Sequence, residues 1–175
     1  LTHLNLEDNL IDYGGSRFIA SALKVNKSLR HISLKLNRLD DKAGSKLCND
    51  LEQNKSVIES LNLSSNLLAN MFCESLAEYL KLNDSIKKLD VSCNEIEESN
   101  AATLKDSLEG NPNIVEIQVR NNHFTEDTQN EINEKVTRNY LKNKNITYQK
   151  LGDCKLSHFI LIFLSVIRPR KGTGS

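Results

Sequence analysis

The chain is 175 residues long, which suits a single domain, and its 23 basic and 23 acidic residues give a formal net charge of zero. This balance argues against nucleic acid or an anionic membrane surface as the main partner. The cysteines form no C-x-x-C pair, so they indicate neither a zinc site nor a disulfide framework and favour a reduced, intracellular protein. They are Cys48, Cys73, Cys93 and Cys154.

A nine-residue motif, L-x-x-L-x-L-x-x-N, opens the chain and occurs five times. Its final asparagines, here called the ladder asparagines, are Asn9, Asn37, Asn66, Asn94 and Asn122. They are separated by 28, 29, 28 and 28 residues, and a fixed period in the range of about 20 to 50 residues is typical of stacked repeats. The sequence therefore predicts a leucine-rich repeat protein.

Each motif predicts a short strand, because apolar residues spaced by two lie on one face of an extended chain. The roughly 20 residues after each motif are long enough for the helical crossover that joins parallel strands. The predicted fold class is α/β: a leucine-rich repeat solenoid, a horseshoe segment with parallel strands on the concave face and helices on the convex face. The apolar motif positions are Leu1, Leu4, Leu6, Leu29, Ile32, Leu34, Ile58, Leu61, Leu63, Ile86, Leu89, Val91, Ile114, Ile117 and Val119.

The first connection contains Gly14 and Gly15, which we expect to form a turn before a helix begins. In every repeat, the tenth and fourteenth positions after the ladder asparagine are apolar and predict a helix face that packs on the sheet. These positions hold Ile19, Leu23, Leu47, Leu51, Leu76, Leu80, Leu104, Leu108, Ile132 and Val136. The seventh position is small in four repeats and would allow close helix packing; it holds Ser16, Gly44, Cys73 and Ala101, with Gln129 in the fifth.

An asparagine stands at the seventeenth position of every repeat, where the predicted helix should end. Asparagine tolerates the left-handed conformation that commonly ends a helix, so we expect these residues to be helix stops. They are Asn26, Asn54, Asn83, Asn111 and Asn139.

The fifth predicted helix is richer in charge than the others, which suits a terminal repeat with a solvated outer face. Thr125 is expected to cap its N-terminus, and the solenoid is expected to end near Asn143. Its predicted inner face carries Ile132, Val136 and Tyr140, and its predicted outer face carries the ion pairs Glu131–Lys135 and Glu134–Arg138.

The domain organisation that we predict has two parts. Residues 1–143 form five leucine-rich repeats, and Leu1 begins on a motif position without a capping element, so we expect a fragment of a longer array that continues upstream. Residues 144–175 form a non-repeat tail that we expect to be poorly ordered or foreign to the natural domain; packing of its apolar part on the last repeat is the alternative. The apolar stretch 156–167 is too short to span a membrane.

The open face of the predicted strands is polar and of mixed charge, and extended faces of this kind in solenoids bind other proteins. We therefore predict a protein-binding concave face. It consists of His3, Asn5, Glu7, His31, Ser33, Lys35, Ser60, Asn62, Ser64, Lys88, Asp90, Ser92, Glu116, Gln118 and Arg120.

No motif for catalysis or cofactor binding accompanies this face. Gly14 and Gly15 lack the further glycine or lysine of a phosphate loop, and no nucleophile elbow or H-E-x-x-H motif is present. His3 and His31 should be neighbours near Glu7, but a third well-placed ligand for a metal is missing. We expect no enzyme, no metal, no cofactor and no small-molecule substrate.

A period of 28 to 29 residues with a full helix resembles the ribonuclease-inhibitor type of leucine-rich repeat. The stretches LKLNRLDDKAGSKLCNDLEQNK at 34–55 and LDVSCNEIEESNAATLKDSLEGN at 89–111 resemble the C-terminal repeats of the T-complex-associated testis-expressed protein family. This resemblance rests on Leu47, Cys48 and Leu51 in one predicted helix and on the turn at 92–94. It implies the leucine-rich subunit of the nexin-dynein regulatory complex, a scaffold of the ciliary and flagellar axoneme that regulates dynein-driven motility.

The alternative hypothesis is a ribonuclease-inhibitor-like or immune-sensor-type module that regulates a soluble protein in the cytoplasm. An inhibitor face is expected to present aromatic anchors. The chain has no tryptophan, and its tyrosines lie off the strand positions, which weakens the inhibitor hypothesis; they are Tyr13, Tyr79, Tyr140 and Tyr148.

Overall fold

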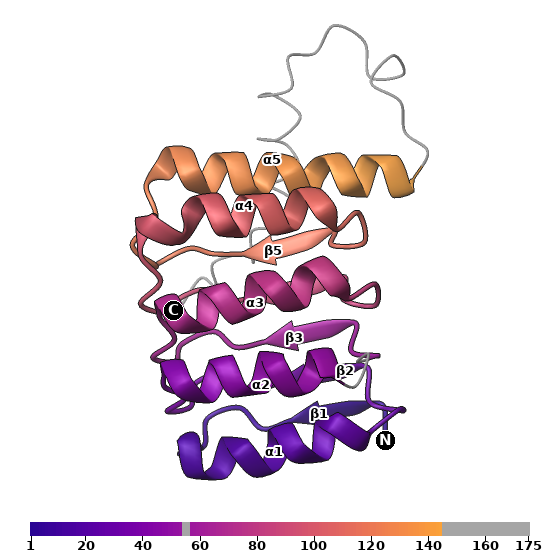
Figure 1. Cartoon of the computed structure of the whole chain (residues 1–175), viewed down its shortest axis with the longest axis vertical. Coiled ribbons are helices and arrows are strands. Elements are labelled where there is room, and N and C mark those ends of the chain that lie inside the picture. The colour runs from indigo at the N-terminus through magenta and orange to yellow at the C-terminus, as the bar shows by residue number, and fades with distance from the viewer. Residues whose placement is uncertain (54–56, 145–175) are drawn as a thin grey trace, which may run out of the picture.

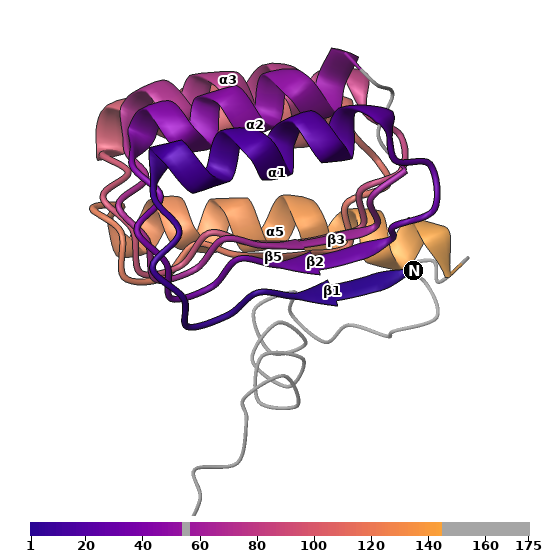
Figure 2. The ribbon, with the colours of Figure 1, turned by 90° about the horizontal axis from the view of Figure 1, so that it is seen from below.

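A computed structural model describes residues 1–53 and 57–144 as five coils, each made of one strand, a connection and one helix. The strands form one parallel sheet in the order β1-β2-β3-β4-β5, and the helices stack in a second layer (Figures 1 and 2). The predicted solenoid fold is confirmed. Its elements are β1 (His3–Asn5), α1 (Tyr13–Val25), β2 (His31–Ser33), α2 (Asp41–Gln53), β3 (Ser60–Asn62), α3 (Asn70–Leu82), β4 (Lys88–Asp90), the 3-10 helix η1 (Glu98–Asn100), α4 (Ala101–Gly110), β5 (Glu116–Gln118) and α5 (Glu126–Asn143).

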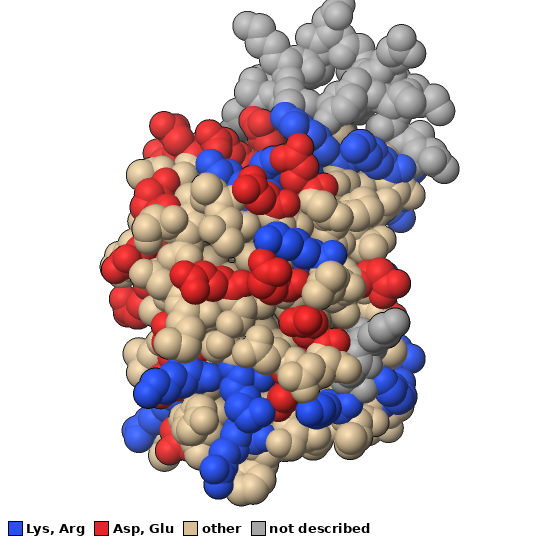
Figure 3. All heavy atoms as spheres, viewed as in Figure 1, with Lys and Arg blue, Asp and Glu red and all other residues tan. Residues whose placement is uncertain are grey.

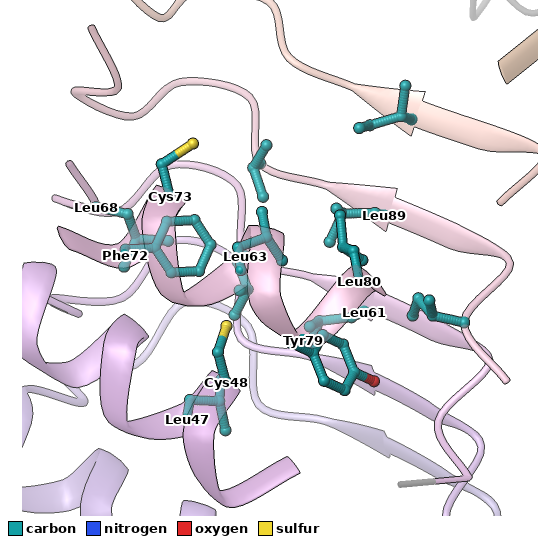
Figure 4. Close-up of a cluster of buried hydrophobic side chains, with 14 of the residues drawn as sticks. Leu47, Cys48, Leu61, Leu63, Leu68, Phe72, Cys73, Tyr79, Leu80 and Leu89 are labelled. Carbon is teal, nitrogen blue, oxygen red and sulfur yellow. The ribbon is translucent and has the colours of Figure 1, made fainter. Parts of the chain in front are cut away.

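The core lies between the sheet and the helices. Each strand contributes its central apolar residue, such as Leu61 in β3, and each helix contributes the stripe at its tenth and fourteenth positions (Figure 4). All members of that stripe are buried except Ile19, which is half-buried. Apolar burial of this kind contributes about 25 cal/mol for each Å² removed from water, so stacking stabilises coils that could not fold singly.

The ladder asparagines join neighbouring coils. Asn66 Nδ2 donates to the carbonyl of Leu34 in the preceding coil at 3.0 Å, and its Oδ1 accepts from the N–H of Leu39 at 3.0 Å. Asn37, Asn94 and Asn122 form the same two bonds to the coils before them. One side chain thus satisfies buried backbone groups of the neighbouring coil, which would otherwise cost free energy.

The residue before each ladder asparagine adopts the left-handed conformation, with φ between 53° and 56°. The chain turns sharply there, from the strand into the connection, and the ladder side chain then points back along the stack. None of these residues is glycine: they are Asp8, Leu36, Ser65, Cys93 and Asn121.

The seventeenth-position asparagines were expected to end the helices by adopting the left-handed conformation, and this expectation is wrong. Asn26, Asn83 and Asn111 do follow helices, but with extended φ values of −77°, −95° and −117°. Their side chains instead hold the next turn: Asn83 Oδ1 accepts from the N–H groups of Ser85 and Ile86 at 3.0 and 2.8 Å. Asn139 lies inside α5 and donates to the carbonyl of Asn111 at 2.9 Å. Asn54 lies outside the described residues.

Two further local expectations need correction. Gly14 and Gly15 form the first turn of α1, capped by Asp12, whose carboxylate accepts from the N–H of Gly15 at 3.0 Å. Glu131 does not pair with Lys135 along α5; it pairs with Lys105 of α4 at 2.6 Å.

Other expectations for α5 are confirmed. Thr125 caps the helix by accepting from the N–H of Thr128, and Glu134 pairs with Arg138 at 3.5 Å. On the inner face, Ile132 and Val136 are buried, whereas Tyr140 is half-buried and the neighbouring Leu141 is buried.

Two cysteines belong to the core between α2 and α3. Cys48 and Cys73 are free thiols, and burial raises the pKa of both, that of Cys73 to about 12. Cys93 is exposed. Cys154 and residues 145–175 of the predicted tail lie outside the described residues. Within the described ranges no helix is long and apolar enough to cross a membrane.

Candidate protein-binding face

The concave face is built by the parallel register of the strands. His3, His31, Ser60, Lys88 and Glu116 align along one row, and the residues two positions further on align along the next. The predicted residues divide by exposure. His3, Asn5, Glu7, Lys88 and Arg120 are exposed; His31, Ser33, Lys35, Ser60, Asn62, Asp90, Ser92, Glu116 and Gln118 are half-buried; Ser64 is buried.

The expectation that Ser64 lies open on this face is wrong, because the side chain is only 3% exposed. Its hydroxyl and its N–H donate to Oδ1 of Asn62 at 2.8 and 3.0 Å. Ser92 makes the equivalent bonds to Asp90. A serine two residues after an Asn or Asp folds back into this local turn, so its hydroxyl is already occupied at the strand end.

Two histidines dominate the first end of the face. The rings of His3 and His31 stack with centroids 4.2 Å apart and planes 18° apart. They border a shallow hollow of about 270 Å³ that reaches to Ser60 and Asn62. Their predicted adjacency is confirmed, but Glu7 is engaged elsewhere, since its carboxylate accepts from the Ser33 hydroxyl at 2.7 Å.

The metal hypothesis gains no support from this arrangement. Among residues 1–53 and 57–144 there is no cluster of three or more His, Cys, Asp or Glu side chains suited to a metal ion.

Charged side chains lie at the other end of the face. Lys88 and Glu116 pair across β4 and β5 at 2.8 Å. They border a second hollow of about 160 Å³ together with Ser60, Asp90 and Gln118. Arg120, two residues after the end of β5, is exposed. The face therefore offers hydrogen-bonding groups and charges of both signs.

A charged row that the sequence analysis missed runs beside the amino ends of the strands. Glu59 pairs with Lys87 at 2.8 Å and with Arg30 at 3.9 Å. The hydrogen bond from Lys87 lowers the pKa of Glu59. The signal was present in the sequence, because these residues occupy the same motif position in successive repeats with alternating sign.

The helix face is also divided by charge. Basic side chains gather over α1 and α2, whereas acidic ones cover the region of α3 (Figure 3). Arg17 and Lys24 lie in α1, and Glu74 and Glu78 lie in α3. The tyrosines of the described residues lie in helices, which confirms that they are absent from the strand positions; Tyr148 lies outside those residues.

The repeated motif, the parallel sheet and the open polar face together define a leucine-rich repeat protein. The Leucine Rich repeat family matches residues 25–48. NACHT, LRR and PYD domains-containing protein 4C of Mus musculus is 32% identical over 108 residues, which cover 62% of this chain and 10% of that protein. NACHT, LRR and PYD domains-containing protein 12 of Homo sapiens is 36% identical over 78 residues, which cover 45% of this chain and 7% of that protein. The chain thus spans about a tenth of the length of these relatives.

Solved structures share the fold. Leiomodin-1 Actin-Binding Site 2 matches with a TM-score of 0.73 at 21% identity, over 86% of this chain and 87% of that one. The Caenorhabditis elegans tropomodulin C-terminal domain matches with a TM-score of 0.67 at 17% identity, over 87% and 90% of the two chains. At these identities the similarity shows the solenoid architecture alone.

Proposed function

We propose that this chain is a non-enzymatic protein-binding module that captures a protein partner on the concave face of β1 to β5. The observation that carries the proposal is that polar side chains of both charge signs align in register over five strands. The face that they form is shallow. Such a surface presents many weak contacts over an extended area, which suits a macromolecule better than a small substrate.

The size of the face limits what it can hold. Five strands spaced about 4.8 Å apart span roughly 19 Å. That length matches about six residues of an extended segment or about three and a half turns of a helix. The hollows at both ends of the face are small, which favours a segment that lies across the strands over a single deep anchor.

Two cellular settings are consistent with this binding role. The first is a sensor-type module that regulates a protein partner in the cytoplasm; we propose it because the chain is similar to NACHT, LRR and PYD domains-containing proteins. The resemblance of residues 34–55 and 89–111 favours an axonemal scaffold of the nexin-dynein regulatory complex. We give the sensor-type setting precedence, because its relatives align over more than half of the chain.

The localisation of a tagged full-length protein in a ciliated cell separates these settings. A sensor-type module is expected to leave with the detergent-soluble fraction, whereas an axonemal scaffold remains with the detergent-resistant axoneme. Co-sedimentation with filamentous actin is a third measurement, because Leiomodin-1 Actin-Binding Site 2 shares the fold. Retention of the protein on the axoneme would contradict the sensor-type hypothesis and favour the axonemal scaffold.

The binding face is tested by charge reversal. The double variant Lys88→Glu with Arg120→Glu changes two exposed concave side chains, and we expect it to reduce retention of co-purifying proteins by at least about tenfold. The matched control is Arg17→Glu with Lys24→Glu on α1, which reverses the same charge on the helix face. Equal retention by both variants, with unchanged circular dichroism, would show that the concave face is not the contact.

A further inference from the structure

A further hollow lies on the helix side of the molecule, opposite the proposed binding face. It has a volume of about 500 Å³, larger than either hollow of the concave face. It follows helix α2, which lies between α1 and α3 in the helix layer (Figures 1 and 2). We call this hollow the α2 trough. Most of its lining comes from Tyr13, Lys42, Lys46, Asn49, Gln53 and Met71.

Short side chains on the outer side of α2 leave room for the trough. Ser45 and Asn49 stand at the eighth and twelfth positions after their ladder asparagine, where α3 carries Glu74 and Glu78. Ser45 is buried, and its hydroxyl bonds that of Ser75 at 2.6 Å, which holds α2 closely against α3. The surface over α2 is therefore hollowed.

The trough is elongated along the helix. Lys42, Lys46, Asn49 and Gln53 recur at spacings of three and four residues, so they lie on one side of α2. Eleven residue steps separate the first from the last, which is roughly 16 Å along a helix. An extended peptide of about five residues has the same length. The shape of the trough therefore fits a segment of a protein chain better than a small anion.

One end of the trough combines apolar surface with a cation. Tyr13, Lys42 and Met71 stand in the first turns of α1, α2 and α3. The side chains of Tyr13 and Met71 are 42% and 47% exposed, and they flank the lysine from the two neighbouring helices. This end of the trough therefore suits an apolar side chain that lies beside a negative charge.

The free charge of the trough is positive. Lys42 is exposed, and no carboxylate of the described part of the chain pairs with it. Lys46 pairs with the buried carboxylate of Asp50 at 2.7 Å and keeps two further N–H groups for a ligand. Two nearby carboxylates are occupied, because Asp12 caps α1 and Asp41 accepts from N–H groups at the start of α3. The trough also lies in the basic part of the helix face (Figure 3), which attracts a negatively charged segment.

We propose that the α2 trough binds an acidic peptide segment of a partner protein. One carboxylate of the segment pairs with Lys42, and a second accepts a hydrogen bond from Lys46. An aromatic or long aliphatic side chain beside them packs between Tyr13 and Met71. The two exposed carboxamides further along α2 donate to and accept from the backbone of the segment.

Met71 gives a direct readout of this site because it is the one methionine of the chain. The whole chain, labelled with carbon-13 in the methionine methyl group and freed of its initiator methionine, shows one methyl signal by NMR. The probe is the synthetic peptide Glu-Glu-Phe-Glu-Glu, whose aromatic ring shifts that signal on contact. We expect a saturating shift with a dissociation constant of about 0.1 to 1 mM, weakened by added salt. Lys-Lys-Phe-Lys-Lys should cause no shift.

Charge reversal locates the contact. Lys42→Glu is expected to weaken binding of the acidic peptide at least about tenfold, because it places a like charge in the trough. The matched control, Lys24→Glu, makes the same change on α1 outside the lining and should alter the dissociation constant by less than about twofold. Lys88→Glu with Arg120→Glu should leave the shift unchanged, which separates this site from the concave face. Unchanged circular dichroism shows that each variant is folded.

Three results would overturn the proposal. The first is the absence of a saturating methyl shift with the acidic peptide. The second is equal weakening by Lys42→Glu and Lys24→Glu, which would show attraction to the basic surface as a whole. The third is a shift that inorganic phosphate causes and the peptide does not, which would assign the trough to a small anion.

Discussion

The ladder asparagine is the residue on which the stack depends most directly. Its amide reaches two coils because one group carries both a donor and an acceptor. A leucine or alanine could fill the space but could not satisfy the buried carbonyl and N–H groups of the preceding coil. This explains why the motif ends in the same polar residue five times although its surroundings are apolar.

Replacing one ladder asparagine tests this role. Asn66→Ala leaves the N–H of Leu39 and the carbonyl of Leu34 without their partners in a buried region. We expect a loss of about 3 kcal/mol in the free energy of unfolding, measured by urea titration. Asn9→Ala in the same chain is the control and should cost less than about 1 kcal/mol, since its bonds are local and exposed. Similar losses at both positions would contradict the joining role.

The buried thiols predict a loss of stability in alkali. Burial raises the pKa of Cys73 from 9.0 to about 12, so the unfolded chain releases this proton at a lower pH than the folded chain does. Unfolding then releases protons, and the free energy of unfolding should fall as pH rises above about 9, by up to about 1.4 kcal/mol per pH unit for this thiol. Urea titrations between about pH 8 and 11 should show a shallower decline for Cys73→Ala; an identical slope would contradict this prediction.

At the scale of the element, each helix is positioned by its neighbours as much as by its own sequence. The Asp41 carboxylate of α2 accepts from the N–H groups of Ala69, Met71 and Phe72 at the start of α3. Glu98 likewise accepts from the N–H of Thr125 and the hydroxyl of Thr128 at the start of α5. These bonds lower the pKa of Glu98. Carboxylates are favourable at helix N-termini, where N–H groups lack partners.

The contact between α2 and α3 depends on a glycine. A Cβ atom at Gly44 would lie 2.5 Å from Leu68 Cδ2 and 2.7 Å from Phe72 Cδ2, both buried. Gly44→Ala should therefore cost about 1 to 3 kcal/mol despite the better helix propensity of alanine. Gly110→Ala in α4 is the control, because nothing lies within 4 Å of its added carbon. Thermal unfolding should show a lower midpoint for the first variant and an unchanged or higher one for the second.

The sequence period predicted the strands and helices well because the same pattern of apolar and polar residues recurs in each repeat. The strand positions, the apolar helix stripe and the Thr125 cap all follow from the spacing of residues within one repeat. The failures concern contacts between repeats and local turns. Glu131 had two lysines in reach, and the sequence could not show that Lys105 of the previous helix lies closer than Lys135. Ser64 was misplaced because a local turn overrode the alternation of the strand.

At the scale of the whole molecule, the two ends of the described stack differ in how far their apolar side chains are shielded from solvent. The last coil is covered by α5, whereas the first coil exposes Leu1 and half-exposes the apolar residues behind it. Repeat proteins are stabilised by contacts between neighbours, so a coil with one neighbour is less stable than a coil with two. Opening of the native stack should therefore begin at the first coil.

Hydrogen exchange followed by mass spectrometry measures this gradient. Amides of residues 6 and 8, which donate to the second coil, should exchange faster than those of residues 91 and 93, which make the equivalent bonds further along the stack. Uniform exchange across the coils would indicate that the described solenoid opens as one unit.

The left-handed turn before each ladder asparagine has one more consequence. Leu36 adopts φ of 53° with an exposed side chain, a conformation that costs a leucine roughly 1 to 2 kcal/mol and a glycine almost nothing. Leu36→Gly should therefore relieve this backbone strain and raise the free energy of unfolding. The turn at Leu36 is thus a place where the fold can be made more resistant to heat without changing any side chain of the proposed binding face.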